Sequence, residues 1–398
     1  MTLAFDAQRL ARLDEHFAAY VDDGRLPGWQ LGIVHRDELV HTASYGWRDR
    51  ERGLEVEPDT LWRIASMTKP VASVAAMTLW EEGAFELDDP ISRWIPSFEH
   101  VRVYAKGSAG APVTVPATEP VRVWHLLTHT SGLTAGFVDT HVVDALYRKA
   151  GLGWGYPAGI DLAGACDLLA ELPLLFEPGT RWGYGASTDV LGRLVELWSG
   201  QSLEAAVAAR VTGPLAMQDT TWWVGPDRAD RLAALYGPHP ATGALTRLDQ
   251  MGEQWLRPPQ VHGAGGGLVS STADYLRFAR MLARGGELDG ARVLAPRTVA
   301  LMTQDHLPSD LVSLSTGGFA ETSFEGVGFG LGFATVHDPV AQRSGASRGE
   351  FFWGGAASTA FWVDPLEDVA VVFMTQVLPS STYPIRSQLR QLVYSALV

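Results

Sequence analysis

Residues 66–70 read Ser66-Met67-Thr68-Lys69-Pro70. Ser66 and Lys69 are three positions apart, just under one helical turn, so a helix places the serine hydroxyl and the lysine amine on one face. Proline is tolerated in the first turn of a helix but not in its interior, and Pro70 therefore places Ser66 near the helix start. There the backbone N–H of Ser66 is free to bind an anion. The stretch predicts a serine hydroxyl that can share a proton with a lysine amine.

Lysine is rare in this chain. Only three of the 31 basic residues are lysines, namely Lys69, Lys106 and Lys149. Arginine stays protonated at working pH, whereas a desolvated lysine can lose its proton. Because a serine hydroxyl is a poor nucleophile without an adjacent base, Lys69 is a candidate activator of Ser66. The alternative is an exposed lysine beside a serine that caps a helix.

Outward from this stretch, both ends of the chain carry strand patterns. Residues 29–35 and 39–45 are rich in aliphatic and aromatic side chains and flank a polar turn. Residues 358–363 and 368–375 repeat that pattern near the C-terminus. An amphipathic helix precedes the first pair, and another begins near Pro384 after the second. The termini are therefore expected to build an antiparallel sheet with flanking helices.

The middle of the chain shows helical periods instead. Helical repeats, separated by long Gly/Pro-rich connections, cover residues 66–82, 188–198 and 203–211. The sequence thus predicts an α/β fold with an all-helical lobe as an insert. We expect residues 1–64 and 263–398 to form a discontinuous sheet domain and residues 65–262 a mainly helical domain. The functional site is expected in the groove between the two.

A glycine run marks the return to the sheet domain. Residues 263–267 contain four glycines and precede Leu268 and Val269, after which Thr272 is expected to cap a helix. No Gly-Lys-Ser/Thr follows, and the glycines lead into a strand rather than a helix, so a phosphate-binding loop is not favoured. A close approach of backbone beside a cleft is the preferred interpretation.

Composition limits the partners of the chain. The 398 residues carry a formal charge of −14 and no basic cluster, so binding of nucleic acid or of an anionic membrane is not expected. The N-terminus lacks the features of a signal peptide, and no stretch approaches the ~20 apolar residues of a membrane span. Cys166 is the only cysteine, which excludes an internal disulfide and favours a buried thiol. We expect a cytoplasmic globular protein with a small-molecule partner; its oligomeric state stays open.

Further segments follow Ser66-Met67-Thr68-Lys69 in order. They are the loop Leu126-Leu127-Thr128-His129-Thr130-Ser131-Gly132-Leu133, the stretch Tyr184-Gly185-Ala186-Ser187-Thr188-Asp189-Val190-Leu191-Gly192, the glycine run and the late Trp353-Gly354-Gly355. Together they resemble the serine β-lactamase and penicillin-binding-protein superfamily. The resemblance spans nearly the whole chain and points to the branch of class-C-β-lactamase-like carboxylesterases, often called family VIII esterases. It implies a β-lactamase-like fold.

The resemblance implies a role for each matching residue. Ser66 resembles the acylated nucleophile, Lys69 its proton acceptor or electrostatic support, and Tyr184 a second acid/base group. The N–H groups of Ser66 and Ala356 match the oxyanion hole, the pair of donors that stabilises the tetrahedral intermediate. Lys69 and Tyr184 would titrate as a coupled pair, and which of them is the general base stays open. We expect neither a metal nor a cofactor.

Two departures from the lactamase pattern concern the substrate. Where lactamases have Lys-Thr-Gly, this chain has Trp353, Gly354 and Gly355, which we expect to contact the substrate. An indole offers no positive charge for the carboxylate of a β-lactam, and Trp353 instead resembles an apolar wall for an ester. Ala186 stands where lactamases place an asparagine that contacts the acyl side of the substrate. Both changes favour esters over anionic β-lactams.

The motifs therefore predict a serine carboxylesterase that hydrolyses short-chain acyl esters through an acyl-enzyme, with transesterification as a side activity. A β-lactamase or D-amino-acid peptidase is the alternative of the same class. A noncatalytic penicillin-binding-like protein that binds or assembles is the alternative of another class. The intact set of Ser66, Lys69 and Tyr184 argues against the latter.

Two other sequence patterns give weaker evidence of a functional site. Gly345-Ala346-Ser347-Arg348-Gly349 matches the nucleophile elbow Gly-x-Ser-x-Gly, but no strand precedes it, no helix is expected after it, and no histidine occurs after His337. His125 and His129 are four positions apart without an acidic third ligand, so core packing is preferred over a metal pair.

Overall fold

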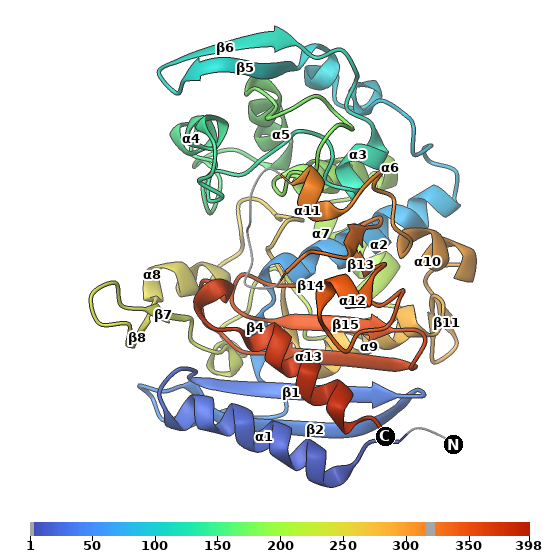
Figure 1. The fold of residues 1–398 in the computed structure, drawn as a ribbon. Helices are drawn as coiled ribbons and strands as arrows, with labels where there is room; N and C mark the ends of the chain where they lie inside the picture. The colour runs from blue at the N-terminus through green and yellow to red at the C-terminus, as the bar shows by residue number, and fades with distance from the viewer. Residues whose placement is uncertain (1–3, 316–322) are drawn as a thin grey trace.

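Both ends of the chain build one sheet, as predicted. The computed structural model describes residues 4–315 and 323–398. Within these residues, eight antiparallel strands form a sheet in the order β12-β13-β14-β15-β16-β1-β2-β3 (Figure 1). The two ends join where β1 pairs with β16 and Gln30 lies opposite Met374. The strands are β1 (Gly28–His35), β2 (Glu38–Asp49), β3 (Leu54–Glu55), β12 (Val327–Phe329), β13 (Ala334–Val336), β14 (Phe351–Gly354), β15 (Ala360–Asp364) and β16 (Val369–Met374).

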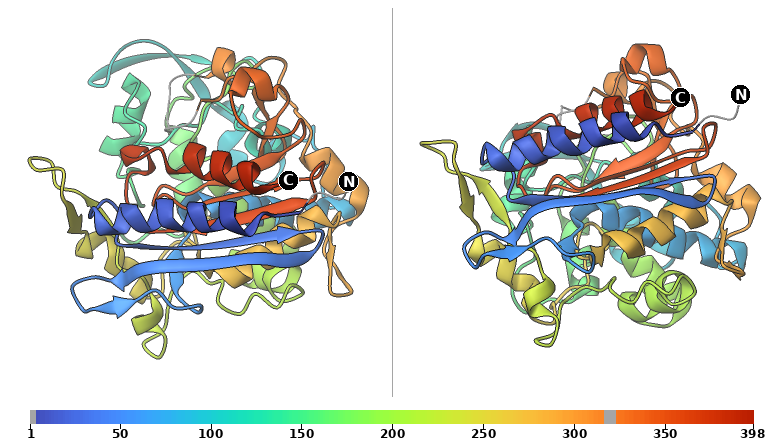
Figure 2. Two further views of the ribbon diagram at one scale, coloured as in Figure 1. Left: turned by 60° about the horizontal axis from the view of Figure 1, so that its bottom comes forward. Right: turned by 90° about the horizontal axis from the view of Figure 1, so that it is seen from below.

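Helices cover both faces of this sheet. α1 (Ala7–Asp22) and α13 (Ile385–Ala396) lie side by side over one face, and α9 (Thr272–Ala283) packs against β1, β15 and β16 on the other (Figure 2). Every residue of β1 and β16 is therefore buried. Strands covered on both faces read as continuous apolar runs, which explains the composition of these two segments.

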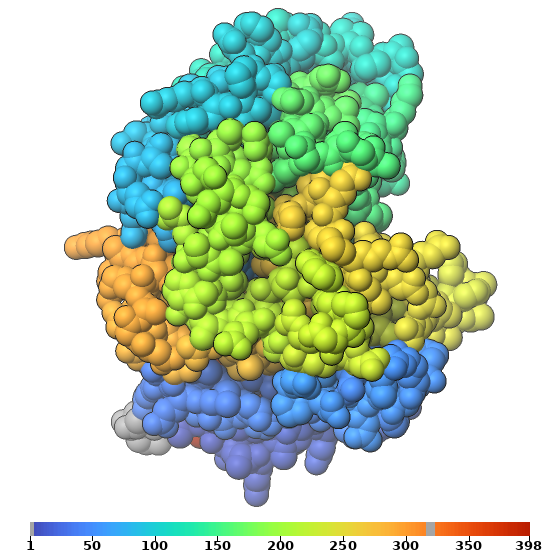
Figure 3. Space-filling view, turned by 180° about the vertical axis from the view of Figure 1, so that it is seen from behind, coloured from blue at the N-terminus to red at the C-terminus, as the bar shows by residue number. Residues whose placement is uncertain are grey.

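The middle of the chain is mainly helical but also contains two hairpins. α2 (Thr68–Glu81) is buried on nearly all sides and packs against α6 (Ser187–Ser199). The hairpins are β5 (Arg102–Ser108) with β6 (Ala111–Pro116), and β7 (Tyr236–Pro238) with β8 (Leu245–Arg247). In Figure 3 the lime and yellow residues of this middle part lie above the blue N-terminal strands. The division into two domains stays a prediction.

Short helices and strands make up much of the rest of the fold. Near the limits predicted for the helical part, β4 (Leu61–Arg63) pairs with β9 (Val269–Ser271), so the two segments that border it lie side by side. The remaining α-helices and β-strands are α3 (Val123–Leu127), α4 (Val142–Lys149), α5 (Leu162–Glu171), α7 (Leu203–Val207), α8 (Asp249–Gly252), α10 (Pro296–Met302), α11 (Leu311–Leu314), α12 (Pro339–Gln342), β10 (Glu287–Leu288) and β11 (Ala291–Arg292).

Two local predictions were wrong in detail. α9 is capped by Ser271, whose side chain accepts a hydrogen bond from the Asp274 N–H, whereas Thr272 lies inside the helix. Thr272 instead donates to Oε1 of Gln30 at 2.6 Å, a partner 242 residues away that local sequence does not reveal. The helix predicted over 203–211 is α-helical only to Val207 and continues as a π-helix, Ala208–Thr212.

Cys166 lies in α5 and is fully buried, as expected of a lone packing cysteine. Burial raises the pKa of its thiol well above the usual range, so the sulfur stays protonated and unreactive. Across residues 4–315 and 323–398, no helix combines the length and apolar character that crossing a membrane requires.

A buried acidic cluster lies between α13 and the sheet. Tyr394 Oη lies 2.5 Å from Glu350 Oε2 and 2.7 Å from Asp364 Oδ2, while Arg390 Nη2 lies 2.8 Å from Glu350 Oε1. A phenol has one hydrogen and cannot donate to two carboxylates, so one of these contacts requires a carboxyl proton. Burial raises the pKa of Glu350, although Arg390 and Tyr394 counteract this effect.

The raised pKa of Glu350 predicts a pH dependence of stability. The folded protein binds this proton more tightly than the unfolded chain, so the contribution is complete below the unfolded pKa of about 4.3. Stability is then lost as pH rises through the folded pKa, with a slope of at most about 1.4 kcal/mol per pH unit for one proton. Thermal unfolding from pH 4.5 to 8 should show a smaller decline in Glu350→Gln than in the native chain. Equal declines would contradict the assignment.

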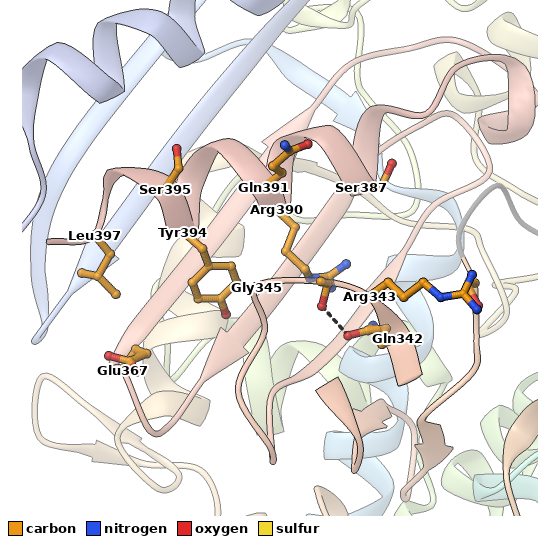
Figure 4. A pocket seen from close by; sticks show the side chains of 12 residues that line it. Gln342, Arg343, Gly345, Glu367, Ser387, Arg390, Gln391, Tyr394, Ser395 and Leu397 are labelled. Carbon is orange, nitrogen blue, oxygen red and sulfur yellow. Dashed lines mark hydrogen bonds between the residues drawn. The ribbon is translucent and has the colours of Figure 1, made fainter. Parts of the chain in front are cut away.

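A surface pocket of about 880 Å³ lies beside this cluster, lined by Arg390, Tyr394 and other residues of α13 together with Gln342, Arg343 and Gly345 (Figure 4). It contains none of the predicted site residues. Gly345 begins the segment that matches the nucleophile elbow, and this segment lies in the loop between α12 and β14. It neither follows a strand nor opens a helix, which agrees with the sequence-based rejection of a nucleophile elbow.

Candidate active site

Ser66 lies at the entrance to the central helix. It occupies a 3₁₀ turn, Ala65–Met67, that leads directly into α2, and Pro70 is in the first turn of that helix. Ser66 is half-buried, so solvent reaches it. Ala65 has a φ of +44°, a left-handed conformation that non-glycine residues rarely adopt. Backbone strain of this kind gathers at functional sites, where the surrounding structure holds it in place.

Lys69 meets Ser66, as the spacing predicts. Its Nζ lies 3.5 Å from Ser66 Oγ and donates to the carbonyl oxygen of Gly265 at 2.5 Å. The side chain is only 5% exposed. The same Nζ lies 4.5 Å from the centroid of the Tyr184 ring. The amine is thus held between the serine, the glycine run and the tyrosine.

Tyr184 reaches this place from the loop before α6. The ring is buried and lies 5.4 Å from the Trp353 ring and 5.0 Å from the His129 ring, centroid to centroid. The structure therefore brings together Ser66, Lys69, Tyr184 and Trp353, four residues that the chain places far apart except for the first two.

The loop Leu126–Leu133 supports the Tyr184 segment. The Gly183 N–H donates to the His129 carbonyl at 2.9 Å, and the Ala186 N–H donates to the Thr134 carbonyl at 3.2 Å, so both sides of Tyr184 are held. At Gly185 an added Cβ would lie 2.3 Å from the carbonyl carbon of Thr134, so only glycine permits this close approach. The loop Leu126–Leu133 and the adjoining Thr134 therefore position the segment that carries Tyr184.

The two histidines occupy separate environments. His125 Nδ1 accepts from the Arg122 N–H at 3.1 Å, and burial, together with the Arg122 charge, lowers the pKa of His125 to about 4. His129 is buried against Tyr184 and Phe329, and burial first, then the nearby Lys69 charge, holds the pKa of His129 well below its usual range. Both are neutral residues of the core, as the packing interpretation predicts.

Asp189 is a site residue that sequence reasoning missed. Its Oδ1 accepts from the Gly265 N–H at 2.8 Å, and an added Cβ at Gly265 would lie 2.6 Å from its Oδ2. The glycine whose carbonyl binds Lys69 is thus held by a buried carboxylate. A Cβ at Gly266 would lie 3.6 Å from the carbonyl carbon of Ala65, an ordinary van der Waals distance, so the glycine run lies beside Ser66 without a tight approach at that position. A buried aspartate in the first turn of α6 was the signal available.

Trp353, Gly354 and Gly355 end β14 and begin the loop to β15. Trp353 is 4% exposed and carries no charge, and Gly354 is half-buried. The loop touches the segment before Ser66, because Thr359 Oγ1 donates to the Ile64 carbonyl at 3.4 Å. Outside the helices and strands of residues 4–315 and 323–398, no described backbone hydrogen bond uses the N–H of Ser66 or of Ala356. The segments that carry these two N–H groups meet here.

The fold and this site define the class of serine enzymes that share the architecture of β-lactamases and penicillin-binding proteins. The family model described as Beta-lactamase matches residues 13–395, and the chain belongs to this family.

Proteins of similar sequence and structure support this family assignment. Protein Rv1367c of Mycobacterium tuberculosis is 38% identical over 361 residues, covering 90% of this chain and 88% of that one. Esterase EstB of Burkholderia gladioli is 32% identical over 413 aligned positions, covering 98% of this chain and 97% of the relative. The structure of EstCE1, described as a hydrolase with promiscuous acyltransferase activity, superposes with a TM-score of 0.81 at 27% identity and covers 97% of this chain and 99% of that one.

Proposed function

We propose that this protein is a serine carboxylesterase of the Ser-x-x-Lys type, of the family VIII kind, that hydrolyses short-chain acyl esters and transfers acyl groups to alcohols as a side reaction. The observation that carries the proposal is the contact of Lys69 with both Ser66 and Tyr184. The names of EstB, an esterase, and EstCE1, a hydrolase with acyltransferase activity, support it.

The reaction proceeds in two steps. Ser66 Oγ attacks the ester carbonyl carbon while its proton passes to the Lys69–Tyr184 pair. The N–H groups of Ser66 and Ala356 stabilise the oxyanion, and the C–O bond to the alcohol then breaks as the pair returns the proton to the leaving oxygen. Water attacks the acyl-enzyme by the same route and releases the acid. An alcohol that replaces water yields a new ester instead.

Trp353 favours esters over β-lactams. It is buried beside Tyr184 and has no positive charge with which to bind the carboxylate of a β-lactam. Ala186 removes the amide that a lactamase would offer to the acyl side of its substrate. No described contact in the site favours the lactamase or the peptidase alternative.

The purified protein should hydrolyse p-nitrophenyl butyrate with a kcat/KM about 10- to 100-fold above that for nitrocefin, because one lost charge-assisted contact is worth roughly 1.5–3 kcal/mol. Spectrophotometric assays of both substrates measure the ratio. Comparable values would support a β-lactamase and contradict the proposal.

In the same assay, added methanol should divert part of the acyl group into methyl butyrate, and a product mixture free of that ester would contradict the transfer activity.

A further inference from the structure

The loop that carries Ala356 is held by an arginine from the last helix. Arg386, in the first turn of α13, is half-buried. Its Nη2 donates to the carbonyl oxygens of Gly355 at 2.7 Å and of Thr359 at 3.1 Å. One guanidinium group thus ties together the two ends of the loop between β14 and β15.

The two glycines of this loop are closely packed, Gly355 against backbone and Gly354 against the end of the Arg386 side chain. A Cβ at Gly354 would lie 2.5 Å from Arg386 Cζ, so the guanidinium rests directly on the glycine Cα. A Cβ at Gly355 would lie 2.2 Å from Thr359 Oγ1 and 2.4 Å from the Ile64 carbonyl oxygen. The loop is therefore clamped between Arg386 and the segment that leads into Ser66.

This clamp determines where the Ala356 N–H points. The Gly355 carbonyl and the Ala356 N–H belong to one planar trans peptide unit and point in opposite directions. Because Arg386 holds the carbonyl, the N–H is directed away from the guanidinium. The Ser358 N–H also donates to the same carbonyl, at 3.1 Å, which further restrains the peptide plane. A charged donor on the carbonyl also polarises the N–H.

We propose that Arg386 is a positioning residue for the oxyanion hole: it orients and polarises the Gly355–Ala356 peptide so that the Ala356 N–H stabilises the transition state. The inference rests on the proposed esterase function. Loss of an oxyanion-hole donor lowers kcat by about 10²–10³-fold. Loss of its orientation alone should lower kcat by about 10–100-fold and leave KM within about 3-fold, since the effect arises only in the transition state.

The test compares Arg386→Gln and Arg386→Lys with Arg48→Gln. Arg48 is a matched control, because its guanidinium also donates to two backbone carbonyls, those of Asp230 and Glu55, and belongs to β2 rather than to the site. The readouts are kcat and KM for p-nitrophenyl butyrate, the inhibition constant of phenylboronic acid, whose serine adduct is tetrahedral and anionic, and the midpoint of thermal unfolding.

Arg386→Gln should lose kcat and boronate affinity by the same factor, Arg386→Lys should retain part of both, and Arg48→Gln should change only the unfolding midpoint. Native kcat in Arg386→Gln, or a loss of kcat without a loss of boronate affinity, would overturn the proposal. If Arg386→Gln does not fold, Arg386→Lys decides: its kcat and boronate affinity should fall together, because one ammonium replaces the guanidinium that binds the Gly355 and Thr359 carbonyls, and native values of both would overturn the proposal equally.

Failure of this inference is distinguishable from failure of the proposed function. If Ser66→Ala is inactive while Arg386→Gln is fully active, only the role of Arg386 is refuted. If Ser66→Ala remains active, the proposed function itself is refuted.

Discussion

Replacing Ser66 with alanine is expected to lower kcat for p-nitrophenyl butyrate by about 10⁴-fold or more, as removal of the nucleophile does in other serine hydrolases. The Ser66 hydroxyl is half-buried, and it forms a hydrogen bond with the Lys69 amine. Fold and stability should hardly change, because the substitution removes one partly exposed oxygen. Initial rates at enzyme concentrations up to micromolar, together with thermal unfolding, measure both.

Ser347→Ala is the matched control for this experiment. Ser347 lies in the segment that matches the nucleophile elbow, far from Lys69 in the sequence, and its replacement should leave kcat within about 2-fold. Native activity of Ser66→Ala with loss of activity in Ser347→Ala would reverse the assignment of the nucleophile.

Replacing Lys69 is expected to have an effect nearly as large. The amine lies 3.5 Å from Ser66 Oγ and is bound to the Gly265 carbonyl, so Lys69→Met removes both the proposed partner of the serine proton and the charge beside Tyr184. General acid–base catalysis contributes about 10²–10⁴-fold, and we expect kcat to fall by about 10³-fold. Lys149→Met, at an exposed position in α4, should leave kcat unchanged.

Lys69→Arg separates the two roles left open for this residue. Arginine keeps the positive charge but does not release its proton at working pH. A loss as large as that of Lys69→Met is expected if Lys69 transfers protons. Substantial activity in Lys69→Arg, measured as kcat with p-nitrophenyl butyrate, would contradict that role and leave only electrostatic support.

The sheet could be predicted from sequence because its signals are local. Alternating and continuous apolar runs at both ends specify strands such as β1 and β16, whatever lies between them in the chain. The hairpin of β5 and β6 was missed because its strands are mostly exposed, so they lack the apolar pattern that marks a buried strand. The cap of α9 was misplaced by one residue because Ser271 and Thr272 are both good caps.

The site could be predicted only in part, for a related reason. Ser66 and Lys69 meet because three positions make nearly one helical turn, which local spacing reveals. Tyr184 and Trp353 entered through resemblance to a family. Asp189 and Arg386 act on backbone atoms 76 and 31 residues away, respectively, and neither periodicity nor a motif encodes such a contact.

The central claim is that Ser66 carries the acyl group, and a covalent label tests it most directly. The protein is exposed briefly to a fluorophosphonate or an activated ester, its intact mass is measured, and the adduct is located by peptide mapping. We predict one adduct, on the peptide that contains Ser66, and none on Ser66→Ala. An adduct on another residue, or no adduct on the active native protein, would contradict the account.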